Sequence, residues 1–284
     1  MLSLVVHFCR LLQLLQSRKQ TTSPRNTVHF ILYNPPQNYR ELVTNRRSSA
    51  SASCATMEYK QIEMEDCDQV LEHLRRSFFA DEPLNKSAGL CQNGSSCIAL
   101  EAHCVEAIKD RMSLMAVDAK VEGCCKIAGV VLNGILRPGN AAKSLKKLDS
   151  TSDADFRKIF ELLHGHSLKY NLFEHFAVGS IFDVRILSVD SGYRGQGIAN
   201  ELVKQSVAVA KANGFRLMKA DATGIFSQKI FRSHGFEVFS EQPYDKYTDK
   251  HGKVILPVEA PHIKMQQLYK RICEGDKDDK EQPH

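Results

Sequence analysis

Hydrophobic and polar residues alternate with two different periods along the chain, and each period predicts one kind of element. Alternation at every second residue predicts strands, and an apolar stripe at every third or fourth residue predicts helices. The pattern predicts strands at 58–64, 113–120, 125–134, 181–189, 215–222 and 236–242, and helices from 66, at 95–112, at 153–170, at 197–214 and at 226–235. The segment 262–272 fits either an extended or a helical conformation.

Several residues predict where these elements begin, end and face the core. Asp66 is typical of a helix cap, and Val70, Leu71, Leu74 and Phe78 then fall on one face. Pro83 disfavours helix at Glu82, so this helix is expected to end within 80–85. In the second helix the apolar stripe is expected at Ile98, Ala102, Val105 and Ile108, and a hairpin turn is expected at Glu122 and Gly123.

The order of these elements indicates the fold class. Strands and helices alternate through the second half of the chain, which favours an α/β domain over an all-helical or all-strand one. The 284 residues are 43% hydrophobic and 25% charged, an ordinary globular composition. We expect one domain at 57–273, preceded by a leader at 1–56 and followed by a charged tail at 274–284.

The net charge of +5 is concentrated in the leader. Residues 1–56 hold seven basic side chains against one acid, Glu41, so the remaining residues sum to about −1. A domain near neutrality lacks the basic surface of a nucleic-acid binder. The leader is too short and interrupted in its apolar part to span a membrane, so we expect no membrane partner. It resembles a disordered extension or a mitochondrial transit peptide, and we expect a cytoplasmic protein, or a mitochondrial one if the leader is such a peptide.

Cysteine and histidine spacing does not predict a metal site. The nine cysteines form no C-x-x-C pair, so the ligand spacing of zinc sites is missing and reduced thiols are expected. His164 and His166 are two residues apart on a predicted helix and point to different faces. We therefore expect no metal.

The stretch "SVDSGYRGQGIANELV", residues 188–203, joins a predicted strand to a predicted helix. Its glycines, Gly195 and Gly197, let a phosphate group approach the amides at the helix start, although a tight turn without a ligand fits them equally well. A Walker loop would need Lys and Ser or Thr after Gly197, where Ile198 and Ala199 stand. A dinucleotide fingerprint would need a third glycine at Asn200, so that alternative is the weaker one.

The spacing Arg194-x-x-Gly197-x-Ala199 resembles the pyrophosphate-binding signature of the GNAT acyltransferases. The stretches "FFADEPLN", "ILSVDSGYRGQGIANEL", "ATGIFSQKIF" and "APHIKM" resemble, in that order, the insect-type arylalkylamine N-acetyltransferases. The resemblance covers roughly 57–273. It implies a GNAT fold, with a mixed and mostly antiparallel central sheet flanked by helices, and acetyl-CoA as the cosubstrate.

The same resemblance implies roles for individual residues. Glu82 in "DEPLN" becomes the general base, and Asp81 a loop or capping group. Ser227 and Thr223 match the family's two catalytic serines, and their i, i+4 spacing suggests one helix turn that presents both hydroxyls. Phe231 stands where many GNAT enzymes carry a tyrosine acid. The implied cofactor-binding residues form two sets. A backbone N–H in the first set would bind the oxyanion, and that set is Leu187, Ser188 and Val189. The second set would bind the diphosphate and is Arg194, Gly195, Gln196, Gly197, Ile198 and Ala199.

The function that the resemblance implies is transfer of acetyl from acetyl-CoA to an arylalkylamine such as dopamine, serotonin or tyramine, by a protein that we expect to be a monomer. Phe78, Phe79 and residues 171–178 are candidates for the amine pocket, although core packing explains them as well. Two alternatives stay open: a polyamine or protein N-acetyltransferase, and a non-catalytic acyl-CoA-binding module. Glu82 and Ser227 together argue against the last of these.

Overall fold

The computed structural model describes residues 57–92, 95–119 and 126–272. The predicted leader, the predicted tail and the predicted turn at Glu122 and Gly123 lie outside the described residues. The strands are β1 Met57–Gln61, β2 Leu114–Asp118, β3 Lys126–Leu136, β4 Ile181–Val189, β5 Leu217–Ala222, β6 Glu237–Pro243 and β7 Lys264–Arg271. The helices are α3 Cys67–Ser77, α4 Pro83–Ala88, α5 Ile98–Lys109, α6 Asn140–Leu148, α7 Ala154–Lys169, α8 Leu172–Phe176, α9 Ile198–Ala212 and α10 Ile225–Ser233.

The strands form one sheet in the order β1-β2-β3-β4-β5-β7-β6. The pairing of β4 with β5 is parallel, and the other pairings among the described strands are antiparallel. This confirms the predicted mixed and mostly antiparallel sheet. The ambiguous segment 262–272 is strand β7, which lies between β5 and β6 and so brings the C-terminal part of the domain into the middle of the sheet.

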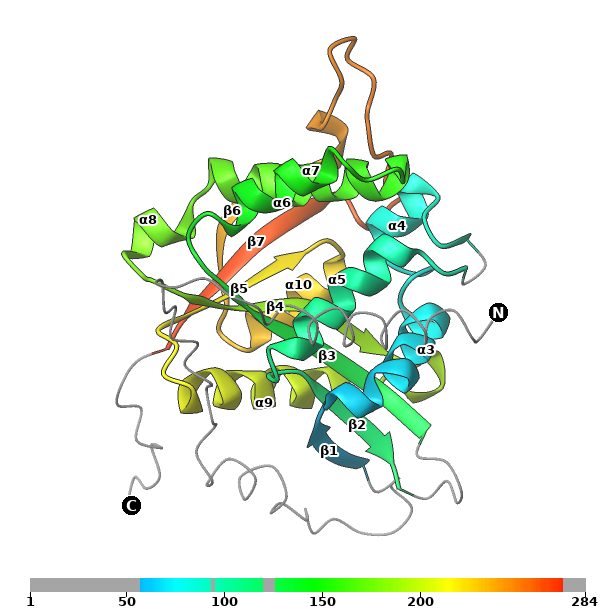
Figure 1. The fold of residues 1–284 in the computed structure, drawn as a ribbon, viewed down its shortest axis with the longest axis vertical. Coiled ribbons are helices and arrows are strands. Elements are labelled where there is room, and N and C mark those ends of the chain that lie inside the picture. The colour runs from blue at the N-terminus through cyan, green and yellow to red at the C-terminus, as the bar shows by residue number, and fades with distance from the viewer. Residues whose placement is uncertain (1–56, 93–94, 120–125, 273–284) are drawn as a thin grey trace, which may run out of the picture. The chain divides into compact units, whose positions relative to one another are not determined.

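Helices cover both faces of the sheet because the strands are apolar on both faces. In β3, Val130 and Leu132 pack into the cluster that includes residues of α3, α5 and α7. Val131, between them, packs into the cluster that includes residues of α9 and α10. Such alternation follows from the period of two in a strand. Figure 1 shows α3 and α5 in front of the sheet and α6 beside α7.

Three predicted details at the helices are wrong. Asp66 precedes α3 without capping it, because its carboxylate accepts instead from the Glu63 N–H at 3.0 Å. In α5, Ile98 is 82% exposed, because the buried face is formed by other apolar residues of this helix. The first helix ends at Ser77, before the expected 80–85, although Glu82 is extended ahead of Pro83 as expected. Pro83 itself opens α4 as its first residue, a position where its missing N–H costs nothing. The buried apolar residues of α5 are Leu100, Cys104, Ala107 and Ile108.

Two Gly→Ala substitutions are expected to change stability in opposite directions. A Cβ on Gly129 would lie 3.0 Å from both the Ser188 carbonyl oxygen and Ile198 Cγ2, so Gly129→Ala should lower the free energy of unfolding by about 1–3 kcal/mol. Gly165 lies inside α7, and no atom lies within 4 Å of the position that its Cβ would take. Gly165→Ala should therefore raise the free energy of unfolding by about 0.5–1 kcal/mol. Urea denaturation measures both, and equal signs would contradict the packing of α9 on β3.

Candidate active site

Strands β4 and β5 separate from each other within the sheet. They pair at Phe182, Asp183 and Val184, whereas β4 continues to Val189. Beyond Val184, β4 keeps β3 on one edge, and none of the described strands covers its other edge. Backbone groups on such an edge are available to a ligand. The predicted residues Leu187, Ser188 and Val189 lie on this open stretch.

The side chain of Ser188 is engaged inside the protein. Its Oγ lies 3.1 Å from Nε2 of the buried His73. Burial lowers the pKa of His73 to about 4, so the imidazole is neutral at pH 7. The Ser188 hydroxyl is therefore not free at the open edge. Its backbone groups point toward β3, as those of Asp190 do, so the backbone of Leu187 and Val189 faces the open edge.

The loop after β4 is shaped by a side-chain hydrogen bond and by two glycines. Asp190 Oδ1 accepts from the Gly192 N–H at 2.9 Å and holds the first turn. Gly195 and Gly197 both have φ of +79°, in the left-handed region that favours glycine, and no atom lies within 4 Å of either Cβ position. Helix α9 then begins at Ile198, and the first N–H groups of a helix have no partner within it. The predicted residues 195–199 thus form an open, positively polarised cradle that can accept a phosphate group.

Arg194 connects this loop to the segment that carries Glu82. Its Nη2 donates to Asp81 Oδ2 at 2.9 Å, and its Nε donates to the Val189 carbonyl oxygen at 3.3 Å. Asp81, expected as a loop or capping group, is thus an ion-pair partner. Both side chains of the pair are more than half exposed, and exposed pairs contribute little stability. The guanidinium can therefore exchange Asp81 for a phosphate at little cost.

Glu82 is held by hydrogen bonds from two directions. Its Oε2 accepts from the Asn85 N–H at 2.7 Å, as the cap of α4, and its Oε1 accepts from Thr223 Oγ1 at 2.6 Å. The Tyr244 hydroxyl donates to the Thr223 carbonyl oxygen at 2.6 Å and holds the backbone of Thr223 in place. Burial raises the pKa of the Glu82 carboxyl above its usual value, and hydrogen bonds from Thr223 and from the backbone of Asn85 and Leu84 oppose part of this rise. A carboxylate with a raised pKa is a stronger base near neutral pH.

Thr223 and Ser227 do not share a helix turn, so that prediction is wrong. The backbone of Gly224 is extended, and α10 therefore begins at Ile225 and leaves Thr223 in the connection from β5. Thr223 donates to Glu82, whereas the Ser227 hydroxyl donates to the Gly224 carbonyl oxygen at 2.9 Å. The two hydroxyls have different partners and can serve different purposes.

A cavity of about 720 Å³ has Glu82 and Thr223 in its wall. Five aromatic side chains line it, namely Phe78, Phe156, Phe160, Tyr170 and Phe173. Of the predicted pocket residues, Phe78, Asn171, Leu172 and Phe173 line the cavity. Phe79 is instead fully buried in the core, and Phe176 packs against Phe239 and Tyr269.

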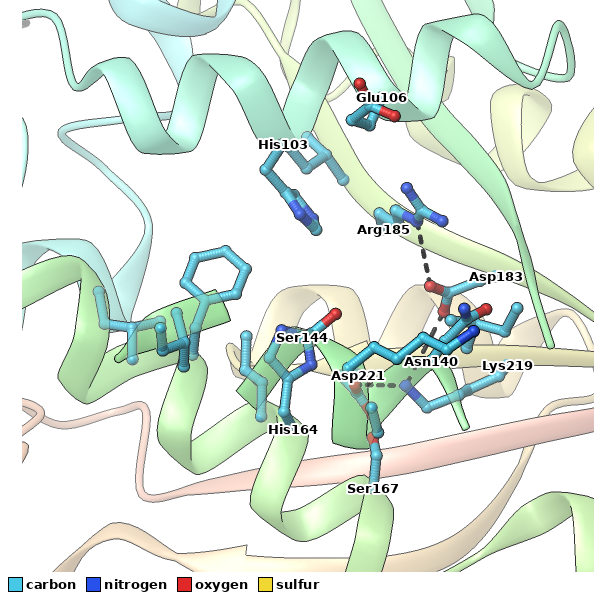
Figure 2. Close-up of a pocket in the computed structure, with 18 of the residues that line it drawn as sticks. His103, Glu106, Asn140, Ser144, His164, Ser167, Asp183, Arg185, Lys219 and Asp221 are labelled. Carbon is cyan, nitrogen blue, oxygen red and sulfur yellow. Dashed lines mark hydrogen bonds and ion pairs between the residues drawn. The ribbon is translucent and has the colours of Figure 1, made fainter. Parts of the chain in front are cut away.

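The charges that line the cavity cancel. Five carboxylates face five cations: Glu82, Glu106, Asp110, Asp183 and Asp221 against Arg137, Lys143, Lys147, Arg185 and Lys219. Figure 2 shows four of them, Asp183, Arg185, Lys219 and Asp221, joined in one ionic network.

The ionic network is formed by β4 and β5 at the end of their paired stretch, where Asp183 lies opposite Lys219. Lys219 Nζ lies 2.5 Å from Asp221 Oδ2 and 3.8 Å from Asp183 Oδ1, and Arg185 Nε lies 3.2 Å from Asp183 Oδ2. Burial lowers the pKa of Lys219, but the two carboxylates outweigh it and hold the pKa above its usual value. Burial raises the pKa of Asp221, against the opposing effect of Lys219. The sequence prediction missed this network, although charged residues two apart inside apolar strands, as in "FDVR" and "MKAD", were a usable signal.

His166 and three of the cysteines have structural surroundings, whereas His103 and His164 line the cavity. His166 Nε2 lies 2.8 Å from Ser240 Oγ, and Cys91, Cys97 and Cys104 are buried thiols. Across 57–92, 95–119 and 126–272, no group of three or more His, Cys, Asp or Glu side chains could hold a metal ion. Over the same ranges no helix is both long and apolar enough to cross a bilayer.

Comparison with known proteins identifies the fold and the family. Residues 174–236 match the model of the acetyltransferase (GNAT) family. The structure of arylalkylamine N-acetyltransferase 2 from Aedes aegypti shares 43% identity with this chain, with a TM-score of 0.73, over 77% of this chain and 100% of that one. The mosquito arylalkylamine N-acetyltransferase like 5b, at 21% identity, has a TM-score of 0.69 over 76% of this chain and 100% of its own. The polyamine N-acetyltransferase of Drosophila melanogaster, at 18% identity, has a TM-score of 0.67 over 76% and 100%.

The two structures of lower identity show the fold alone, whereas the first is also similar in sequence, with 43% identity over 100% of its own chain. The resemblance found in the sequence motifs is thereby confirmed. The chain belongs to the GNAT acetyltransferases, in the family of insect-type arylalkylamine N-acetyltransferases.

Proposed function

We propose that this acetyltransferase transfers acetyl from acetyl-CoA to the primary amine of an arylalkylamine, by direct attack in a ternary complex. The observation that carries the proposal is the Glu82 carboxylate. It is held by Asn85 and Thr223 in the wall of a cavity lined by aromatic side chains. A non-catalytic acyl-CoA-binding module would have no use for a half-buried carboxylate in that place.

The charge balance of the cavity favours an arylalkylamine over a polyamine. A polyamine carries a second cation, which needs an excess of carboxylates to replace its hydration. The five carboxylates of the lining are matched by five cations, three of them on or just before α6. The aromatic side chains Phe78, Phe156 and Phe160 instead offer edges and faces for an aryl ring.

Glu82 solves the protonation problem of the amine. An alkylamine has a pKa of roughly 10, so it reaches the site mostly protonated and without a nucleophilic lone pair. The carboxylate accepts the proton, and the Thr223 hydroxyl keeps the carboxylate oriented while it does so.

The open edge of β4 and the glycine loop fit acetyl-CoA. The fit rests on the unpaired stretch after Val184, the left-handed Gly195 and Gly197, and the empty space beside both glycines. When bound, acetyl-CoA supplies an acetyl group activated as a thioester. A backbone N–H among Leu187 to Val189 donates to the carbonyl oxygen, and Ser227 holds a proton for the leaving sulfur.

Glu82→Gln is expected to lower kcat at pH 7 by about 10²- to 10⁴-fold, because the amide cannot accept the proton. The affinity for acetyl-CoA, measured by calorimetry, should stay within about twofold. Glu259→Gln is the matched control. Glu259 is an exposed carboxylate that forms an ion pair with Lys86 of α4, the helix that Glu82 caps. Normal turnover in Glu82→Gln would place the base elsewhere.

The pH dependence should report the hydrogen bond between Thr223 and Glu82. Because kcat/KM needs the ionised carboxylate, it falls as the pH drops through the pKa of Glu82. The Thr223 hydroxyl stabilises the ionised form, so Thr223→Val should raise that pKa and move the acidic limb up by roughly one pH unit. Ser227→Ala should lower kcat with its acidic limb unmoved. An unmoved limb in Thr223→Val would assign the limb to another group.

Gly197→Leu is expected to weaken acetyl-CoA binding about tenfold or more, since its side chain would strain the loop and fill the cradle. Gly214→Leu is the matched control at the other end of α9, with φ of +70° and no atom within 4 Å of its Cβ position. Gly214→Leu should lower the free energy of unfolding by a comparable amount and keep the wild-type Kd for acetyl-CoA. Equal Kd values for both variants and the wild type in calorimetry would remove the loop from the binding site.

A further inference from the structure

Asp221 and Gln267 face the cavity from neighbouring strands. Asp221 on β5 lies directly opposite Gln267 on β7 in an antiparallel register. Opposite residues in such a pair point to the same face, with Cβ atoms about 5 Å apart. Both residues line the cavity described above.

Each of these two side chains has one polar atom held and one atom without a partner. Asp221 Oδ2 accepts from Lys219, and Asp221 Oδ1 is buried with no hydrogen bond. Gln267 is 1% exposed, its Oε1 accepts from Ser240 Oγ at 3.0 Å, and its Nε2 is buried with no hydrogen bond. Unpaired buried polar atoms are costly, and native proteins retain few of them.

The neighbours of Gln267 are compatible with the orientation of its amide, in which Oε1 accepts from Ser240. Burial lowers the pKa of His166 to about 4, so its ring is neutral and its Nε2 can donate to Ser240 Oγ at 2.8 Å. Ser240 then donates to Gln267 Oε1, which leaves the amide nitrogen as the unpaired end. The pair thus presents one donor, from Gln267, and one acceptor, from Asp221.

A hydroxyl group is the chemistry that satisfies both atoms. It accepts one hydrogen bond and donates another, so it can bind the Gln267 amide and the Asp221 carboxylate together. An ammonium group would leave the Gln267 amide unpaired and would lie close to Lys219. A carboxylate would meet the charge of Asp221.

The position of the pair relative to Glu82 indicates where this hydroxyl sits on a substrate. Thr223, the hydrogen-bond partner of Glu82, follows Asp221 by two residues. The Cα atoms of these two residues are therefore at most about 7 Å apart. An amine at Glu82 and a hydroxyl at Asp221 are therefore separated by a distance that an ethylamine chain and one aromatic ring can span.

We propose that Asp221 and Gln267 are specificity-determining residues that bind a ring hydroxyl of the amine substrate. The proposal rests on the proposed function. The enzyme prefers a hydroxylated arylalkylamine to the same amine without the hydroxyl, because the unhydroxylated ring leaves the pair unsatisfied.

The test compares tyramine with 2-phenylethylamine, which differ by one ring hydroxyl. The wild-type kcat/KM should favour tyramine by about tenfold or more. Gln267→Met keeps the side-chain length and removes the donor, and it should bring the ratio close to one, mainly through a loss with tyramine. Gln267→Glu keeps the acceptor for Ser240 and replaces the donor, and it should lower the ratio as well.

Gln266→Met is the matched control. Gln266 is the next residue on β7 and is also buried, but it points to the other face of the sheet and donates to Glu241 at 2.5 Å. Its ratio should equal that of the wild type.

The outcomes separate this proposal from the proposed function. Turnover of 2-phenylethylamine with a wild-type ratio near one would overturn the hydroxyl site and leave the proposed function standing. A ratio that favours tyramine but survives both Gln267 variants would likewise overturn it. Failure of the wild type to acetylate either amine would overturn both proposals.

Discussion

The separation of β4 from β5 is the constraint on which the rest of the site depends. Three residue pairs hold the two strands in parallel, and beyond Val184 the strands diverge. The divergence uncovers one edge of β4 beside the glycine loop. It also places the end of β5, with Thr223, where the side chain can reach Glu82. Both strands belong to the same sheet, and the ion pair between Arg194 and Asp81 joins the loop to the segment that carries Glu82. Together they position the proposed cofactor loop and the proposed base relative to each other.

Local patterns in the sequence were sufficient for the elements that carry the glycine loop. The predicted strand 181–189 coincides with β4, and the loop and α9 follow as expected. The short helices α4, α6 and α8 were not predicted, because each contains too few residues to establish a helical period. The stripe of α5 was misplaced at Ile98 because that helix is apolar on more than one face, so its period does not reveal which face is buried.

Long-range pairings explain what the sequence could not supply at the site. Glu82 was found by its resemblance to a family motif, but its partner Thr223 is 141 positions away, and the contact depends on where β5 ends. The register that sets Asp221 opposite Gln267 depends on β7 entering the sheet between β5 and β6. The segment that becomes β7 was itself ambiguous between strand and helix. Local periodicity contains no information about such neighbours.

Strand β5 and the residue that follows it carry both the ionic network and the hydrogen-bond partner of Glu82. Lys219 and Asp221 lie on one face of it, and Thr223 follows at its end. Lys219 neutralises one oxygen of Asp221, so a buried carboxylate can stay in place with its second oxygen unengaged. Without Lys219, the buried Asp221 carboxylate would have a far larger desolvation cost, and it would attract a cationic group of the substrate instead of a hydroxyl. The ionic network therefore lets β5 present a polar group without net charge to the cavity, two residues before Thr223, the hydrogen-bond partner of the proposed base Glu82.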